Sequence, residues 1–349
     1  MESIYYVMSW LCHRECPHCY DERLRPYHGK ELERVLSEAI TNNPRIIANL
    51  PPRMTYLDRS EPDLYGGFKE KVGRIILAGG EVLLKQVREA VLYPALLQLA
   101  EKYKTQGGVK LIIQTTGDQL TPRIIEELLE RGVWMISVSG IDAYHQGLET
   151  EASRIAAQSR LQAMVEAAGL KHFQEGRDSW GASIESGPWY SFWGATPGSW
   201  IGKLWPRGRA MQNELSTAGI TDNFCNAWSG GLNFLQAGYS GSEVAIDPHG
   251  NVYPCCIKSK KPLGSLISAS LDEILQSLAG NSVYEAISSG HPERMGLEHG
   301  WTEEKFMEMS ATRLPSGQIY RNLCIGCDRF HEEALSAGKA SVASIALQE

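Results

Sequence analysis

Three cysteines close to the amino terminus constrain this chain more than any other feature. Cys12, Cys16 and Cys19 are separated by three and then two residues. Thiols at this spacing can converge on one soft metal centre. The preceding apolar run, residues 5–11, predicts a strand that presents the loop at its carboxyl end. The sequence therefore indicates a metal site on the loop that follows the first strand.

The number of ligands separates two kinds of metal centre for this loop. A tetrahedral zinc ion needs a fourth thiolate or imidazole, which His13 or His18 could supply. Three thiolates suit a four-iron cluster better, because one iron then stays open for another ligand. Unrelated buried thiols are a third interpretation, so the loop needs a second feature that points to the same chemistry.

A short strand that ends in two glycines supplies this second feature. Residues 74–78 form an apolar run that is followed by Gly79, Gly80 and Glu81. Residues 82–103 then have the apolar spacing of a helix. Since glycine has no Cβ, this turn allows the backbone to approach a ligand closely, and it leaves a carboxylate beside the ligand.

Together, the cysteine loop and the Gly-Gly-Glu segment resemble the radical S-adenosylmethionine enzyme superfamily. The resemblance implies that the three cysteines hold a [4Fe-4S] cluster whose open iron binds S-adenosylmethionine. It also implies that the Gly-Gly-Glu segment meets the methionine amino group of this ligand. His18 stands where the family usually has an aromatic residue beside the adenine. Val82 replaces the proline that commonly follows the glutamate, which is a mild departure.

Charge and composition exclude several classes of function. The 349 residues carry a formal net charge of -7 and no long basic run, which argues against a nucleic-acid-binding surface. We find no apolar stretch of about twenty residues and therefore expect no membrane span. The first residues also lack the basic and apolar regions of a signal peptide. We expect a cytoplasmic protein, in which eight cysteines favour metal ligation over disulfides.

Alternating strands and helices predict the fold of the first part of the chain. Such alternation with short links implies parallel strands and right-handed crossovers, and these sheets bind ligands at the carboxyl ends of the strands. We expect a partial (β/α)6 TIM-like barrel in residues 1–215, with an irregular connection around Pro51. The predicted strands after the first are 74–78, 109–114 and 133–138, and the predicted helices are 29–40, 82–103, 123–131 and 151–168.

Two later loops extend the resemblance to the superfamily. Thr115 lies in a Gln-Thr-Thr-Gly segment that looks like the pocket-lining Thr-Asn-Gly of the third strand. Ser137 begins a segment that looks like Ser-x-Asp-Gly, where the serine reaches the ribose or carboxylate of S-adenosylmethionine. Ser139 replaces the aspartate of that segment, and His145 follows it. Arg154 is either a clamp for the methionine carboxylate or a solvated helix arginine.

Residues 180–205 interrupt the regular pattern and leave the sixth strand of the barrel without a placement. Aromatic rings in such a stretch either line a substrate site or form an apolar plug that closes the barrel. The Gly-Arg-Ala of residues 208–210 resembles a segment found where such barrels pass to a second module. Five of the nine tryptophans fall in the interrupted stretch, at Trp180, Trp189, Trp193, Trp200 and Trp205.

A second set of cysteines lies on both sides of a predicted β-hairpin, residues 245–253, whose turn is Gly250-Asn251. This hairpin, a Pro-Leu-Gly loop and a distant Cys-x2-Cys resemble the SPASM/twitch extension of radical S-adenosylmethionine enzymes. The resemblance implies a small α+β domain over residues 216–335 with an auxiliary [4Fe-4S] cluster, and a tail over 336–349. The implied ligands are Cys225, Cys255, Cys324 and Cys327.

Two alternatives remain open for the second set. Cys256 is either a spare thiol or the ligand in place of Cys255. Four thiolates would also suit a structural zinc ion, although the family context favours iron. Four cysteines favour electron transfer over direct binding of the substrate.

The combined resemblance implies an enzyme that reductively cleaves S-adenosylmethionine to a 5′-deoxyadenosyl radical, which abstracts a substrate hydrogen. The auxiliary cluster would accept an electron and give an oxidised or cross-linked product, and a flavodoxin or ferredoxin would donate electrons. The substrate is a small molecule or a peptide, and the eleven residues before Cys12 favour the small molecule because they leave no room for a peptide-recognition domain. Alternatives are peptide maturation with a separate recognition partner, aminocarboxypropyl transfer, and a non-enzymatic zinc or electron-transfer module.

Overall fold

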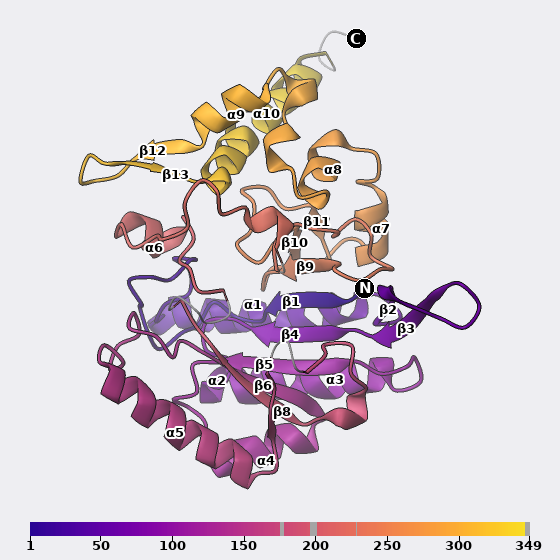
Figure 1. Ribbon diagram of the computed structural model, residues 1–349, viewed down its shortest axis with the longest axis vertical. Coiled ribbons are helices and arrows are strands. Elements are labelled where there is room, and N and C mark those ends of the chain that lie inside the picture. Colours follow the sequence, from indigo (N-terminus) through magenta and orange to yellow (C-terminus); the bar gives the residue numbers. More distant parts are fainter. Residues whose placement is uncertain (175–177, 196–200, 228, 346–349) are drawn as a thin grey trace.

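A nine-stranded sheet organises the computed structural model, which describes residues 1–174, 178–195, 201–227 and 229–345, with side chains up to Leu335. Its strand order is β11-β10-β9-β1-β4-β5-β6-β8-β7 (Figure 1). The strands are β1 Ser3–Val7, β4 Arg74–Ala78, β5 Lys110–Thr115, β6 Val133–Ser139, β7 Lys171–His172, β8 Trp189–Trp193, β9 Glu243–Ile246, β10 Asn251–Tyr253 and β11 Gly264–Ser265.

The core of this sheet is parallel, from β9 through β1 to β7. Its central strands are apolar and fully buried, and Ile4, Ile75 and Ile136 have no exposed surface. Near-continuous apolar strands of this kind need helices on their faces. The parallel α/β core confirms the predicted fold class. The helical segments of the first part are α1 Gly29–Ala48, α2 Lys85–Val87, the π-helical turn η1 Arg88–Leu92, α3 Tyr93–Tyr103, α4 Pro122–Glu130, α5 Glu151–Ala167, η2 Ile184–Ser186 and α6 Gly208–Gln212.

Two features differ from the sequence predictions. The connection that we expected to be irregular contains an antiparallel hairpin, β2 Thr55–Pro62 and β3 Phe68–Val72. Charged side chains occupy many of its positions, so the alternation typical of a half-buried strand is missing from the sequence. The strand that we could not place is β8, which pairs with β6 on one side and with the short β7 on the other. At this end of the sheet, β8 therefore lies between β6 and β7, although β7 precedes it in the chain.

The last third of the chain continues the same sheet. The predicted hairpin is present as β9 and β10, and β9 pairs in parallel with β1. Its turn differs from the predicted Gly250-Asn251, because residues 247–250 connect the strands and Asn251 begins β10. The predicted tail is helical up to Ile345, and residues 346–349 lie outside the described part. The remaining elements are η3 Phe224–Asn226, α7 Leu271–Gln276, α8 Ser282–Ser288, η4 Pro292–Arg294, η5 Leu297–His299, α9 Glu303–Met309, β12 Ala311–Arg313, β13 Ile319–Arg321 and α10 Leu323–Ile345.

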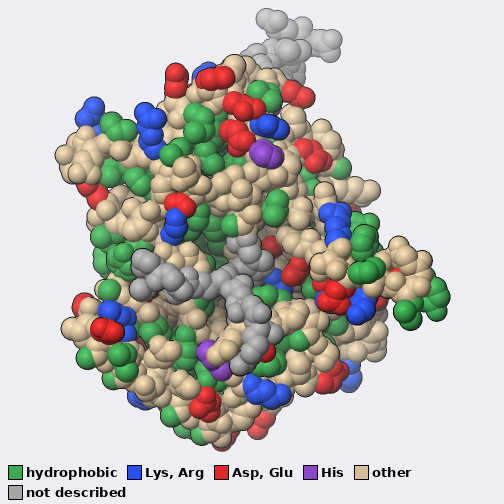
Figure 2. Space-filling view, viewed as in Figure 1, with side chains coloured by type: hydrophobic (Ala, Val, Ile, Leu, Met, Phe, Trp, Pro, Cys, Tyr) green, Lys and Arg blue, Asp and Glu red, His purple; other side chains and the backbone are tan. Residues whose placement is uncertain are grey.

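The surface gives no sign of a polyanion-binding face in the view of Figure 2. Acidic, basic and apolar side chains are interspersed there over the described residues. A nucleic-acid-binding face would instead gather lysines and arginines. Among the described helices, none has both the length and the apolar character that a membrane span requires.

Candidate functional site

A cavity of about 310 Å³ lies at the carboxyl ends of the parallel strands. Its wall combines the cysteine loop after β1 with the ends of β4, β5, β6 and β8. This is where an open α/β sheet binds its ligands. Most of the sequence-predicted site residues meet here, namely Cys12, Cys16, His18, Cys19, Gly79, Gly80, Thr115 and Ser137.

Backbone contacts fold the cysteine loop so that its three thiols face the cavity. The Cys12 N–H donates to the Arg25 carbonyl at 3.0 Å, and the Cys19 N–H donates to the Cys16 carbonyl at 3.2 Å. The Arg14 N–H donates to the Cys12 sulfur at 3.4 Å. Burial raises the pKa of Cys12 to about 12 and also raises the pKa of Cys16 and Cys19. The thiols therefore stay protonated at neutral pH until a metal centre displaces the protons.

Two residues of the Gly-Arg-Ala segment, Arg209 and Ala210, hold this loop by hydrogen bonds. Arg209 donates through Nε to the Cys16 carbonyl at 2.8 Å and through Nη2 to the Leu24 carbonyl at 2.9 Å. The Ala210 N–H donates to the Cys19 carbonyl at 3.2 Å. Sequence reasoning treated the segment as a boundary between modules. The structure shows that it positions the cysteine loop.

The two glycines after β4 allow two backbones to approach each other. A Cβ on Gly79 would lie 2.8 Å from the Ser9 carbonyl oxygen, and a Cβ on Gly80 would collide with the Leu11 carbonyl. We expected the glycines to make room for a ligand. They line the cavity as predicted, but the nearest obstacle to a side chain is the segment between β1 and the cysteine loop.

Glu81 connects the turn after β4 to the turn after β5. It is 1% exposed and is not among the residues that line the cavity. Its Oε1 accepts from the Leu83 N–H at 3.0 Å and from the Thr115 hydroxyl at 2.8 Å. Its Oε2 accepts from the Thr116 N–H at 2.9 Å and from the Thr116 hydroxyl at 2.8 Å. Burial nevertheless raises the pKa of Glu81.

These contacts predict that Glu81→Ala lowers stability as well as ligand binding. The substitution leaves buried donors of Leu83, Thr115 and Thr116 without an acceptor, and each lost bond to a charged group costs about 1.5–3 kcal/mol. Thermal melting should show a clear decrease, and the Michaelis constant for S-adenosylmethionine should rise. Glu81→Gln is the control, since it keeps one acceptor oxygen and should recover most of the stability. An unchanged melting temperature in the alanine variant would contradict this role.

Arg154, a candidate carboxylate clamp, lies outside the cavity wall. Its Nη1 donates to the carbonyls of Leu148 and Glu149 at 2.9 and 3.1 Å. The guanidinium thus braces the loop before α5, just where that helix begins. In this geometry it supports the approach to the helix and does not contact the cavity.

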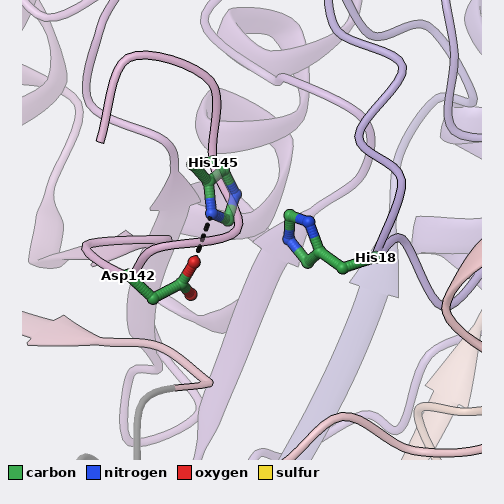
Figure 3. A group of neighbouring side chains, drawn as sticks. All are labelled: His18, Asp142 and His145. Atoms are coloured by element: carbon green, nitrogen blue, oxygen red, sulfur yellow. Dashed lines mark hydrogen bonds and ion pairs between the residues drawn. The ribbon is translucent and has the colours of Figure 1, made fainter. Parts of the chain in front are cut away.

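Three side chains that sequence reasoning did not combine meet at one wall of the cavity (Figure 3). His145 Nδ1 lies 2.9 Å from Asp142 Oδ1, and the rings of His18 and His145 meet at a centroid distance of 4.4 Å. Burial lowers the pKa of His18 to about 4. The three residues offer ligand atoms within 4.8 Å of one another, so they could hold a metal ion or the polar side of a ligand.

Asp142 is the residue that the sequence analysis missed. The sequence showed only that Ser139 replaces an expected aspartate, yet a buried carboxylate follows three positions later on the same loop. Burial by itself would raise the pKa of Asp142, but hydrogen bonds from His145, the Tyr144 N–H and the Ala195 N–H lower it to about 2. The Asp-x-x-His spacing was the available signal.

Polar atoms in the cavity wall indicate a polar ligand. His18 Nδ1, Gln114 Oε1 and Trp205 Nε1 are buried and have no hydrogen-bond partner among the described residues. Buried polar atoms are nearly always paired, so these three fit a ligand that carries its own donors and acceptors. S-adenosylmethionine, with its adenine, ribose and amino acid groups, is such a ligand.

The aromatic stretch contributes to both interpretations that the sequence left open. Trp180, Trp193 and Trp205 line the cavity. Trp189 packs beside buried Trp134 at a ring distance of 6.5 Å and so closes the core. Trp200 lies outside the described residues.

The second cysteine set forms a separate group, in which Cys324 and Cys327 are buried and Cys225 and Cys255 are partly buried. Cys225 lies in η3, Cys255 follows β10, and Cys324 and Cys327 occupy the first turns of α10. Burial and the neighbouring thiols raise the pKa of Cys225, and burial raises the pKa of Cys324 to about 12. Cys256 instead lines the cavity of the first set. None of the eight cysteines, all of which are described, forms a disulfide.

Comparisons with known proteins agree with this arrangement. Residues 239–284, which include β9 to β11 and Cys255, match the SPASM family, an iron-sulfur cluster-binding domain. The match confirms a SPASM-like segment within the predicted second domain. It also favours iron over zinc in the second cysteine set. Among curated proteins, none matches this sequence.

Several solved structures are distantly similar. BtrN in complex with AdoMet and 2-DOIA is 14% identical over 83% of this chain and 88% of its own, with a TM-score of 0.40. Streptococcus suis SuiB bound to S-adenosylmethionine is 14% identical over 82% of this chain and 67% of its own, with a TM-score of 0.42. The enzyme anSMEcpe with bound AdoMet and Cp18Cys peptide is 12% identical over 98% and 99%, with a TM-score of 0.41. At this distance, function has to be argued from the chain's own residues.

Proposed function

We propose that this protein is a radical S-adenosylmethionine enzyme that oxidises its substrate, with an auxiliary iron-sulfur cluster as the electron acceptor. The observation that carries the proposal is that Cys12, Cys16 and Cys19 all line one cavity at the carboxyl ends of parallel strands. When bound, the cluster supplies the electron that cleaves S-adenosylmethionine and so provides the radical that removes a substrate hydrogen atom.

The chain's own residues bind and orient the reactants. Arg209 holds the cysteine loop, and Glu81 fixes the threonines after β5. The hydroxyls of Thr115 and Ser137 line the cavity and can bond the ribose or carboxylate of S-adenosylmethionine. His18 offers a ring that burial keeps neutral and that can pack beside the adenine. Holding the reacting atoms in such a fixed arrangement is the main contribution of the protein in cofactor enzymes.

The oxidation must also dispose of a proton and an electron. Removal of a hydrogen atom from the substrate C–H bond leaves one further electron and one proton to be lost. An auxiliary cluster held by Cys225, Cys255, Cys324 and Cys327 would take the electron, and a base of this chain would take the proton. His145 is placed for the proton, because its Nδ1 bonds Asp142 and its Nε2 is left as an acceptor. The product has lost two electrons and two protons in total.

A small polar molecule with an apolar part suits the cavity best as substrate. The cavity of about 310 Å³ is at the lower end of the range for ligand pockets and would hold S-adenosylmethionine as well, which leaves little room for a large substrate. The tryptophans on its wall provide apolar contact area. A peptide is the second candidate, since SuiB and anSMEcpe have been solved with peptides. We further infer a cytoplasmic location, where thiols stay reduced, and a flavodoxin or ferredoxin as electron donor.

Incubation of the anaerobically reconstituted protein with dithionite and S-adenosylmethionine tests the proposal. The expected product is 5′-deoxyadenosine, detected by mass spectrometry. Methylthioadenosine would instead indicate aminocarboxypropyl transfer. A colourless protein that contains zinc and no sulfide would overturn the enzyme proposal in favour of a zinc module.

The positions of Cys255 and Cys256 predict which of the two binds the auxiliary cluster. Cys255→Ser should lower the iron content from about eight to about four atoms per chain, since it removes one thiolate of a [4Fe-4S] site. Cys256→Ser is the matched control and should keep all the iron, because Cys256 lines the cavity of the first cysteine set. The opposite pattern in iron and sulfide analysis would assign Cys256 as the ligand.

A further inference from the structure

A buried arginine lies against the second cysteine set. Both Nη atoms of Arg207 donate to the Cys324 carbonyl at 3.2 Å. Nη2 also lies 3.0 Å from Asp328 Oδ1. The Arg207 side chain is only 12% exposed. Removing a guanidinium from water costs free energy, which the Cys324 carbonyl and the Asp328 carboxylate offset here. The positive charge of Arg207 is thus held next to the second cysteine set.

The Arg207 charge acts on the whole set of thiols. Burial raises the pKa of all four thiols, and the guanidinium opposes this rise at each of them. Lys258 acts in the same direction on Cys255. Asp328 has the opposite effect on Cys324 and Cys327. Arg207 and Asp328, whose charges have opposite effects on the thiols, therefore lie beside the same group of cysteines.

Charge at this distance alters the redox properties of an iron-sulfur cluster. Reduction adds one negative charge, which a neighbouring cation stabilises and a neighbouring anion destabilises. Net charge, hydrogen bonds and solvent exposure are the protein's means of setting cluster potentials. Because Cys324 and Cys327 are buried and Arg207 is only 12% exposed, solvent ions screen the interaction weakly.

We propose that Arg207 raises the reduction potential of the auxiliary cluster and thereby enables it to accept the substrate's electron, with Asp328 setting the upper limit. The inference deepens the proposed function and rests on it for the electron's origin. Arg207 is a positioning residue, since it acts on the substrate through the cluster.

The segment that contains Arg207 also connects the two sites. Trp205 lines the cavity and packs on Phe224 at a ring distance of 4.5 Å, and Phe224 precedes the ligand Cys225. Two residues after Arg207, Arg209 holds the cysteine loop. The backbone that fixes the radical site thus also fixes the charge beside the acceptor.

Redox titrations of the full-length protein test this inference without turnover. Replacing the three cysteines of the first loop by alanine leaves the auxiliary cluster as the source of the paramagnetic resonance signal. In this background, Arg207→Gln should lower the midpoint potential, whereas Arg207→Lys should remain close to the parent. Asp328→Asn should shift the potential upward. Arg123→Gln is the matched control, because it removes a surface cation that pairs with Glu127 on α4 and should change nothing.

The signs of these shifts decide the inference. An unchanged potential in Arg207→Gln, or a shift of Arg207→Gln and Asp328→Asn in the same direction, would overturn it. If Arg207→Gln loses its iron, an upward shift in Asp328→Asn supports the inference, and an unchanged or lower value overturns it. Zinc in the parent site also overturns it. Failure of the unmodified protein to form 5′-deoxyadenosine, with the predicted shifts intact, would refute the proposed function alone.

Discussion

Alanine in place of Cys12, Cys16 and Cys19 together is expected to abolish 5′-deoxyadenosine formation. Without these thiolates, the first cluster has no ligands on the protein, and the reductive cleavage has no electron source. The iron content should fall to about four atoms per chain, the content of one [4Fe-4S] cluster in the second set. Mass spectrometry of the reaction mixture and iron analysis of the same preparation measure both effects.

A neighbouring residue provides the control for this variant. His13→Ala changes the same loop but removes a side chain that bonds Asp118 at 2.5 Å, outside the three-thiol group. Its iron content should equal that of the unmodified protein. Loss of the metal from His13→Ala would favour a zinc site with an imidazole ligand. Normal 5′-deoxyadenosine formation by the triple alanine variant would refute the assignment of the site.

The double variant Cys324→Ala, Cys327→Ala should separate cleavage from product formation. The first cluster lies on another loop, so S-adenosylmethionine should still be cleaved in the absence of substrate. Product should decrease much more than cleavage, because the substrate radical has lost its electron acceptor. Arg207 would also lose two of the thiolates that its charge faces. Iron, 5′-deoxyadenosine and product should be measured on one preparation.

A structural role of the second metal makes a different prediction for the same variant. The metal would join α10 to η3 and to the turn after β10, and metal binding contributes directly to folding free energy. In that case the melting temperature should fall, and cleavage and product should decrease together. A folded double variant with about four irons and normal product yield would refute the electron-acceptor role.

The sequence was most informative where local chemistry and periodicity agree. Strand β4 has the predicted bounds, and the cysteine loop faces the cavity as expected. A run such as residues 74–78 is both apolar and terminated by glycines, so its local pattern is sufficient to define the strand. The hairpin at β9 and β10 was also predictable, although its turn is residues 247–250 and not the predicted Gly250-Asn251.

The sequence was least informative where long-range contacts decide the structure. Nothing local places His18 against His145, or Arg209 against the Cys16 carbonyl 193 positions away. Strand β8 carries aromatic side chains on both faces and lacks alternation, so only pairing with β6 defines it. The carboxylate of Glu81 was expected to face a ligand, and only the structure shows its four bonds to the turns.

The position of β1 between β4 and β9 has a consequence for how the chain unfolds. In a chain that ended at residue 215, β1 would become an edge strand with unpaired N–H and C=O groups, which is a known route to aggregation. The buried Glu243 side chain, which accepts the Ser3 hydroxyl, would also be missing. Strand β1, which precedes the first cysteine loop, therefore needs β9, from the part of the chain that holds the second cysteine set, to pair its free edge. The two halves should melt in one cooperative transition, and neither should be obtainable as an independent soluble fragment.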